Sequence, residues 1–350
     1  MISLKGLVTG IGSLPHIDSA GAVDLVLRFC PKLPFWPQLP KRSLREGMVG
    51  QFAEGLPGLE FTHQGITFNL KDKDKQLEIF YERIIGQDKK HFAISDSCAS
   101  GLYELKRRLQ HTGTKDIVAI KCHITGPFTF GASLKDEQGI PLLHDSTLRQ
   151  AIVKGLIMKG LWQIDFFKEF NKPMIIFIDE PYLSGFGSAF TPLSKEEVVL
   201  GLKEVAQGLK SNDILVGVHC CGNTDWSIFT EVPEIDIINF DATGFLDSFL
   251  LYVENINDFL KKGGFLCWGV VPTQLTSDLA NRDFFVSQFL NGLQRLIKKG
   301  LERQLLQERI FFSPACGLGA LDISNAEAVL ALLSQVVEKI NYLTKKEKVL

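Results

Sequence analysis

Four polar side chains follow apolar runs, and their types suit a soft divalent metal ion. They are His219 and Cys221 in LVGVHCCGN, Asp241 in IINFDATG, and Cys316 in FFSPACGLG. If each run is a strand, residues two apart point to the same face, so His219 and Cys221 point together while Cys220 points away. Zinc accepts imidazole, thiolate and carboxylate ligands, and an open position makes such a site catalytic. A zinc-bound substrate thiol is held as its nucleophilic thiolate, which points to chemistry on sulfur.

The composition is compatible with a metal-binding enzyme and argues against a nucleic-acid-binding, membrane-spanning or disulfide-rich protein. The chain has 350 residues, 45% of them hydrophobic, and a formal net charge of -2. This near-neutral balance gives no general attraction to nucleic acid or membrane, and no apolar stretch reaches the roughly 20 residues that span a bilayer. The first residues lack a secretory pattern, so we expect a cytoplasmic protein. Seven cysteines at irregular spacing favour reduced thiols over a disulfide framework.

Short apolar runs alternate with longer amphipathic segments along the chain. We expect one strand near 33–39, where prolines obscure the pattern, and seven more near 7–11, 117–122, 174–178, 214–219, 236–240, 265–270 and 310–313. Continuously apolar strands that alternate with helices indicate a parallel sheet covered by helices. The sequence therefore predicts an α/β fold, a (β/α)8 TIM barrel in which residues 1–350 form a single catalytic domain, with a hairpin excursion near 58–70.

A barrel of this kind predicts where function lies, because its active sites sit at the carboxyl ends of the strands. The polar or glycine-rich segments of this chain follow the predicted strands: IGSLPH at 11–16, TGPF at 125–128, DEPY at 179–182, HCCGN at 219–223, FDATG at 240–244 and SPACGLG at 313–319. We expect these segments to meet at one rim of the barrel.

In this order, the segments resemble the C-terminal catalytic barrel of cobalamin-independent methionine synthase. More broadly, the chain looks like a member of the superfamily that joins this enzyme with uroporphyrinogen decarboxylase. The similarity covers residues 7–335 and suggests a stand-alone form of the barrel. It implies a methyltransferase that binds zinc through His219, Cys221 and Cys316. The family's carboxylate ligand, a Glu, falls on Asp241, which is one methylene shorter.

The resemblance also implies where the acceptor thiol, homocysteine in the family, would bind during methionine biosynthesis. The Ile-Gly-Ser segment that holds homocysteine matches Ile11 to Ser13. The Asp-Glu-Pro segment, whose Asp binds the substrate amine, matches Asp179 and Glu180.

The family's second amine-binding carboxylate lacks an obvious match in this chain. A loose alignment puts Arg42 near that position, with Glu46 and Glu54 displaced from it. An arginine suits a carboxylate or sulfonate better than an ammonium group. The acceptor is therefore either homocysteine or another small thiol that carries a sulfonate or carboxylate.

Three departures from the synthase concern its folate donor. The folate-contacting Glu six residues beyond the family's Asp is Gly185 here, and the Trp after Gly-Pro is missing from GPFTFGAS, where Ser133 is nearest. The proton-donating His of the next-to-last strand has no counterpart in CWGVVPTQ, where Thr273 is the closest polar residue. These departures imply a methylated corrinoid as donor, either methylcobalamin or a corrinoid methyl-carrier protein, because cobalt(I) leaves without needing a proton.

Two further functions stay open. A uroporphyrinogen decarboxylase-like enzyme would need cationic side chains for propionates and no metal, which the HCCGN and PACGLG segments argue against. A non-catalytic zinc-binding or corrinoid-binding module would hold the same ligands without turnover. Zinc binding separates the first from the thiol methyltransferase, and turnover on a thiol separates the second.

Overall fold

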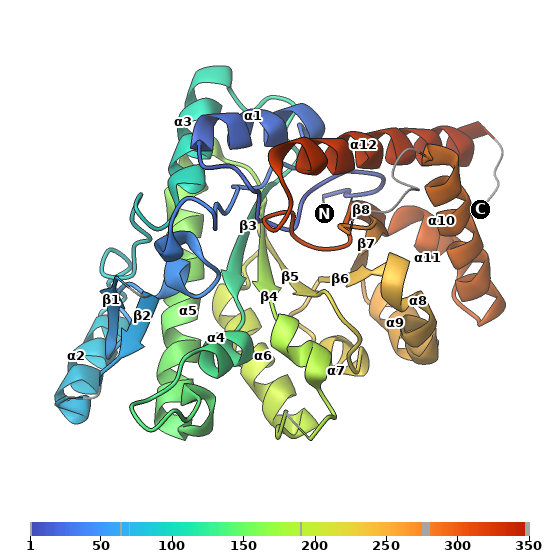
Figure 1. Ribbon diagram of the computed structural model, residues 1–350. Coiled ribbons are helices and arrows are strands. Elements are labelled where there is room, and N and C mark those ends of the chain that lie inside the picture. The colour runs from blue at the N-terminus through green and yellow to red at the C-terminus, as the bar shows by residue number, and fades with distance from the viewer. Residues whose placement is uncertain (1, 64, 70, 190, 275–280, 347–350) are drawn as a thin grey trace.

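The computed structural model describes every residue except 1, 64, 70, 190, 275–280 and 347–350. A curled, six-stranded parallel sheet in the order β3-β4-β5-β6-β7-β8 forms its centre (Figure 1). The strands are β3 (Ile120–Thr125), β4 (Met174–Asp179), β5 (Ile214–Cys220), β6 (Ile237–Asp241), β7 (Phe265–Val271) and β8 (Ile310–Pro314). Almost every strand residue is buried, as expected of a parallel sheet covered by helices.

Most of the helices pack around this sheet (Figure 1), and those between β3 and β8 in the sequence lie in the connections of its strands. They are α1 (Ser19–Phe29), α2 (Lys73–Ile85), α3 (Ser100–Thr112), α4 (Pro127–Ser133), α5 (Ser146–Phe167), α6 (Lys195–Leu209), α7 (Ser227–Thr230), α8 (Ala242–Phe249), α9 (Val253–Lys261), α10 (Arg282–Lys298), α11 (Arg303–Glu308) and α12 (Ile323–Lys346). Within the described part of the chain, none of them has the length and apolar character that a bilayer crossing requires.

The predicted eight-stranded barrel is present only in part. The segments near 7–11 and 33–39, expected as strands, are extended chain that lies between β8 and β3. Single parallel bridges hold them: Val8 with Phe312 of β8, Ser13 with Gln38, and Phe35 with Lys121 of β3. Pro34 and Pro37 lack a backbone N–H, which prevents a continuous hydrogen-bonded ladder in the second segment. The α/β class is confirmed, and six parallel strands form where the sequence predicts them.

The predicted hairpin is confirmed. β1 (Leu59–Thr62) and β2 (Gly65–Phe68) pair in antiparallel register outside the central sheet. They precede α2, so this excursion stands between the second N-terminal segment and β3 in the sequence.

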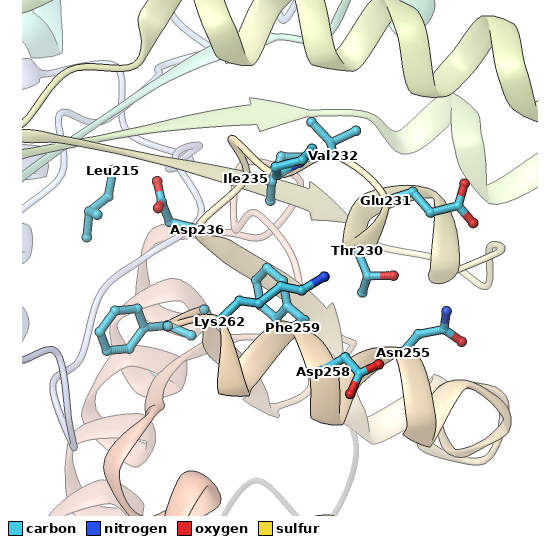
Figure 2. A pocket seen from close by; sticks show the side chains of 14 residues that line it. Leu215, Thr230, Glu231, Val232, Ile235, Asp236, Asn255, Asp258, Phe259 and Lys262 are labelled. Atoms are coloured by element: carbon cyan, nitrogen blue, oxygen red, sulfur yellow. The ribbon is translucent and has the colours of Figure 1, made fainter.

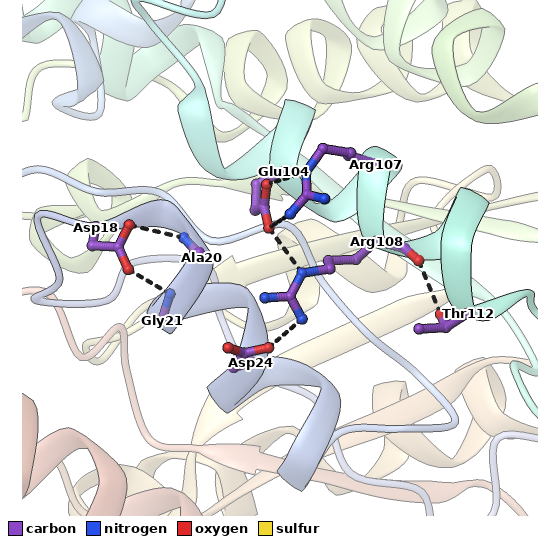
Figure 3. Close-up of polar contacts among 8 residues, drawn as sticks. All are labelled: Asp18, Ala20, Gly21, Asp24, Glu104, Arg107, Arg108 and Thr112. Atoms are coloured by element: carbon purple, nitrogen blue, oxygen red, sulfur yellow. Dashed lines mark hydrogen bonds and ion pairs between the residues drawn. The ribbon is translucent and has the colours of Figure 1, made fainter.

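Helix α1, which lies between the two extended segments in the sequence, is joined to α3, the helix before β3. Asp18 caps α1 by accepting hydrogen bonds from the backbone N–H groups of Ala20 and Gly21 (Figure 3). Arg108 of α3 forms an ion pair with Asp24 of α1, which fastens the helix after the first segment onto the helix before β3.

The interior of the curled sheet changes from apolar to polar along the strands. An apolar cluster near the amino ends contains Phe177, Ile237 and Phe311. Two positions further along the same strands, on the same face, stand Asp179, Asn239 and Ser313. Polar side chains therefore gather inside the sheet at its carboxyl end, where the sequence predicts the site.

Replacing the fully buried Phe311 by Ala should lower the free energy of unfolding by about 3–5 kcal/mol, because it opens a cavity in the interior cluster. Leu251 is 75% exposed, so Leu251→Ala serves as the control and should change stability by less than about 0.5 kcal/mol. Chemical denaturation followed by circular dichroism measures both. Equal losses in the two variants would contradict a packed interior around Phe311.

Candidate metal centre

Three of the four predicted metal ligands converge. His219 is the penultimate residue of β5, Cys221 directly follows that strand, and Cys316 follows β8. One ligand atom from each lies within 4.8 Å of the others. His219 is buried, whereas both cysteines are partly exposed, so the cluster is accessible from one side. One nitrogen and two sulfurs at this separation suit a tetrahedral zinc ion with a position left for substrate.

The charges of these groups are coupled through direct contacts. Hydrogen bonds from Cys316 and His219 to the Cys221 sulfur lower the pKa of Cys221 well below its usual range. The same contact, together with burial, raises the pKa of the Cys316 thiol. Burial opposes a charge on His219, but its hydrogen bond with Cys221 and the negative charge of Asp179 raise its pKa overall. Negative charge therefore collects on sulfur, where a cation would bind.

Asp241 stands apart from this cluster. Its Oδ1 accepts hydrogen bonds from Thr243 N at 2.7 Å, Thr243 Oγ1 at 2.6 Å and Gly244 N at 3.0 Å, so the carboxylate caps α8. Asp241 nevertheless lines the same cavity as Cys221 and Cys316. Its role as a metal ligand stays a prediction.

Asp179 and Glu180 are adjacent in sequence but face different partners. Asp179 is buried at the end of β4, its Oδ1 has no hydrogen-bond partner within the described structure, and burial raises its pKa to about 6. The Glu180 carboxylate accepts from the backbone N–H groups of Phe128 and Thr129 and from Thr129 Oγ1 at 2.6 Å. Glu180 thus holds the N-terminus of α4, while Asp179 keeps a buried oxygen without a hydrogen-bond partner within the described structure.

The predicted substrate segment supports the loop that carries Cys316. Ser13 Oγ accepts a hydrogen bond from Gly319 N at 3.2 Å. A Cβ at Gly317 would lie 2.3 Å from the same oxygen, so this close contact requires glycine. Ser13 therefore lies beside the proposed metal centre, and part of its hydrogen-bonding capacity is used by the loop.

The other two predicted substrate residues have partners within the protein. The carbonyl of Ile11 accepts a hydrogen bond from the buried Lys121 Nζ. Arg42 forms an ion pair with Glu46, whose carboxylate is fully buried. The sequence offered no reason to pair these two side chains beyond their spacing of four residues.

Sequence reasoning missed two polar residues behind His219. Asn239 Oδ1 contacts His219 Nδ1, and Asn239 Nδ2 lies 2.8 Å from Ser313 Oγ. Both residues are fully buried. A polar residue inside an otherwise apolar strand, as in IINF and FFSP, is the signal that could have identified them.

Two cavities lie at opposite ends of the sheet. The one that contains Cys221 and Cys316 has a volume of about 590 Å³ and includes the aromatic rings of Phe245, Phe284 and Phe285. A second, of about 480 Å³, is lined by Leu215 and Phe265 near the starts of β5 and β7 (Figure 2). The described lining of the second cavity has no imidazole or thiol. The groups able to bind a soft metal therefore lie at the carboxyl end, as in enzymes with this type of fold.

No family model and no curated protein matches the sequence of this chain. Among solved structures, the chain is similar to a B12-independent methionine synthase from Shewanella sp. W3-18-1 in complex with selenomethionine. The TM-score is 0.57 at 16% sequence identity, over 97% of this chain and 98% of that chain. A GH5-4 broad specificity endoglucanase from Bacteroides salanitronis covers 70% of this chain and 77% of its own, with 12% identity and a TM-score of 0.38, too low to support an argument. The first likeness shows a shared fold over nearly the whole chain.

The converging ligands predict about one zinc ion per chain. Cys221→Ala and Cys316→Ala should each lose the metal after dialysis, because two remaining ligands hold zinc weakly. Cys220→Ala is the matched control, since Cys220 is buried in the helix-facing core and should leave the zinc content unchanged. Elemental analysis measures zinc, and cobalt(II) substitution should give thiolate charge-transfer absorption that disappears in the first two variants. Unchanged zinc in those variants would contradict the site.

Asp179 should make the metal-free protein less stable as pH rises from about 4 to about 6. Its pKa is about 6 in the folded protein, against about 3.9 in an unfolded chain. The folded state therefore binds more protons within this window, and the free energy of unfolding falls as pH increases. Asp179→Asn removes this contribution. Denaturation of both proteins in the presence of chelator should show the stability of wild type, relative to the variant, falling across the window; a constant difference would contradict the elevated pKa.

Proposed function

We propose that the protein is a zinc-dependent thiol S-methyltransferase that converts homocysteine to methionine with a methylated corrinoid as donor. The observation that carries this proposal is the convergence of His219, Cys221 and Cys316 within 4.8 Å. The fold shared with a methionine synthase supports the same reaction class. We also propose that residues 1–350 act as one catalytic domain, a stand-alone barrel-like enzyme.

His219, Cys221 and Cys316 would hold the zinc, with Asp241 as the proposed fourth ligand. The donor set supports this metal because imidazole nitrogen and thiolate sulfur are ligands that zinc prefers. Bound zinc supplies Lewis acidity that lowers the pKa of an acceptor thiol, so that its thiolate is available at neutral pH. The cavity beside both cysteines gives an incoming thiol access to this position.

Asp179 and the segment from Ile11 to Ser13 would hold the amino-acid end of the acceptor. The unpartnered Oδ1 of Asp179 can accept a hydrogen bond from an ammonium group, and such a contact would offset the cost of burying this carboxylate. The related methionine synthase was solved in complex with selenomethionine, which supports an amino-acid substrate. Glu180 contributes to this arrangement by holding α4 in position.

Arg42 weakens the alternative of a sulfonated or carboxylated thiol. Its guanidinium is paired with Glu46, which is fully buried and cancels the charge that would attract an anion. An acceptor with an ammonium group therefore suits the described residues better than one whose only charge is negative.

The cavity beside the two thiols supports a donor without an anionic tail. Its walls include Pro272 and the rings of Phe245, Phe284 and Phe285, and its described lining has neither lysine nor arginine. A polyglutamyl methyl-folate would find no cationic partner there, whereas a large apolar ring face would contact the aromatic wall. The neighbouring structure is of a B12-independent enzyme, so the corrinoid donor rests on this cavity and on the missing folate contacts.

The reaction transfers one methyl group with balanced charges. The acceptor thiolate attacks the methyl carbon, a sulfur–carbon bond forms, and the bond from the methyl group to the donor breaks with its electron pair staying on the leaving group. The residues of this chain contribute mainly alignment of sulfur and methyl carbon, for which well-oriented reactants gain up to roughly 7–11 kcal/mol. A cobalt(I) leaving group needs no general acid, which agrees with Thr273 in place of the family's proton-donating His.

Product analysis tests this function directly. The zinc-loaded protein and homocysteine are incubated with either methylcobalamin or methyl-folate, and we expect methionine only from methylcobalamin. With methylcobalamin as donor, Cys316→Ala should abolish the product and Cys220→Ala should retain it. Methionine from methyl-folate alone would contradict the proposed donor. Full zinc occupancy without turnover on homocysteine or on amine-free thiols would instead favour a binding module.

A further inference from the structure

A single buried amide, the side chain of Asn239, links the imidazole of His219 on β5 to groups on β7 and β8. Asn239 on β6 contacts His219 Nδ1 through its Oδ1. Its Nδ2 donates to the carbonyl of Cys267 on β7 and to Ser313 Oγ on β8, each at 2.8 Å. The chain of contacts ends at the carbonyl of Pro314, which accepts the Ser313 hydroxyl hydrogen at 2.8 Å.

These contacts determine which atom of each group is the donor. The carbonyls of Cys267 and Pro314 can only accept hydrogen bonds. Ser313 gives its hydrogen to Pro314, so toward Asn239 it acts as an acceptor. Both neighbours of Asn239 Nδ2 are therefore acceptors, and that atom must be the amide nitrogen. Oδ1 then faces His219, and His219 Nδ1 must carry the hydrogen, so Nε2 is the ring nitrogen that can offer its lone pair to a metal ion.

We propose that Asn239 is a positioning residue that fixes His219 in its Nδ1–H tautomer and so directs Nε2 toward the two cysteine sulfurs. The inference rests on the proposed metal centre and adds a residue outside the three ligands. Outer partners of this kind orient a ligating imidazole and raise its basicity, and losing them typically weakens metal affinity about 10-fold to 100-fold. Asn239 is fully buried, so bulk water does not compete with its oxygen for His219 Nδ1.

The tautomer of His219 is the first test. Long-range ¹H–¹⁵N spectra of the full chain, labelled with ¹⁵N-histidine, report which ring nitrogen carries hydrogen, and His219→Gln assigns the signals. We expect hydrogen on Nδ1 and none on Nε2 in the zinc-loaded protein. In the metal-free protein we expect hydrogen on Nδ1 as well, whether or not Nε2 also donates to the Cys221 sulfur. In metal-free Asn239→Ala, Nδ1 should lose its hydrogen in part of the population at a pH where the ring is neutral. A wild-type protein in which Nδ1 carries no hydrogen, with or without metal, would overturn the inference.

Metal affinity is the second test. Asn239→Ala should weaken cobalt(II) binding about 10-fold to 100-fold and shift the d–d absorption, because the imidazole is no longer held. Asn239→Asp keeps an oxygen that accepts from His219 Nδ1 but sets its second oxygen against the carbonyl of Cys267, so it should recover only part of the affinity. Gln163→Ala is the matched control, since Gln163 is another fully buried amide and instead bonds Trp36 and the carbonyl of His123. Its affinity should match wild type.

The two proposals fail in different ways. If wild type binds no zinc or transfers no methyl group, the proposed function is wrong, and the spectra of the metal-free protein still test the tautomer. If wild type binds metal and Asn239→Ala binds it equally well, the positioning role is wrong while the metal centre stands. Equal losses in Asn239→Ala and Gln163→Ala would likewise overturn the role, because the effect would then come from general destabilisation.

Discussion

The candidate site depends on the curvature of one parallel sheet. Cys221 follows β5 and Cys316 follows β8, and two strands lie between them in the sheet. In a flat sheet, three inter-strand steps of about 4.8 Å would separate these ends by about 14 Å. The ligand atoms lie within 4.8 Å of one another instead. A cysteine side chain is too short to cover that difference, so the curl of the strands brings the sulfurs together.

Because the sheet is curled, the two N-terminal segments span the space between its edge strands, β8 and β3. They are held by single bridges. Ser13, on the first segment, also accepts a hydrogen bond from Gly319 in the loop that carries Cys316. Gly317 and Gly319 allow this approach, because a Cβ on either would come within 3.0 Å of the Ser13 side chain. The first N-terminal segment therefore both bridges to β8 at the edge of the sheet and supports the loop that carries Cys316.

The polar side chains inside the sheet are of two kinds: some form hydrogen bonds with one another, and one is a buried carboxylate with an oxygen that has no partner within the described structure. Asn239 and Ser313 satisfy one another and direct His219, so their burial costs little. Asp179 keeps an oxygen without a partner within the described structure, and Lys121 lies near enough to oppose part of the rise in its pKa. An uncompensated carboxylate is costly in a protein interior, and it persists where a ligand completes it.

The sequence by itself determined the six central strands, the β1–β2 hairpin and the residue types of the cluster, because apolar runs and strand-end punctuation are local patterns. It also identified His219, Cys221 and Cys316, with the help of a family resemblance. Only the tertiary structure decided that 7–11 and 33–39 are bridged segments rather than strands, that Arg42 pairs with Glu46, that Glu180 and Asp241 hold helix N-termini, and that Asn239 lies behind His219. Each of these outcomes depends on which groups compete for the same hydrogen bonds once the chain is folded, and most of those groups are far apart in sequence.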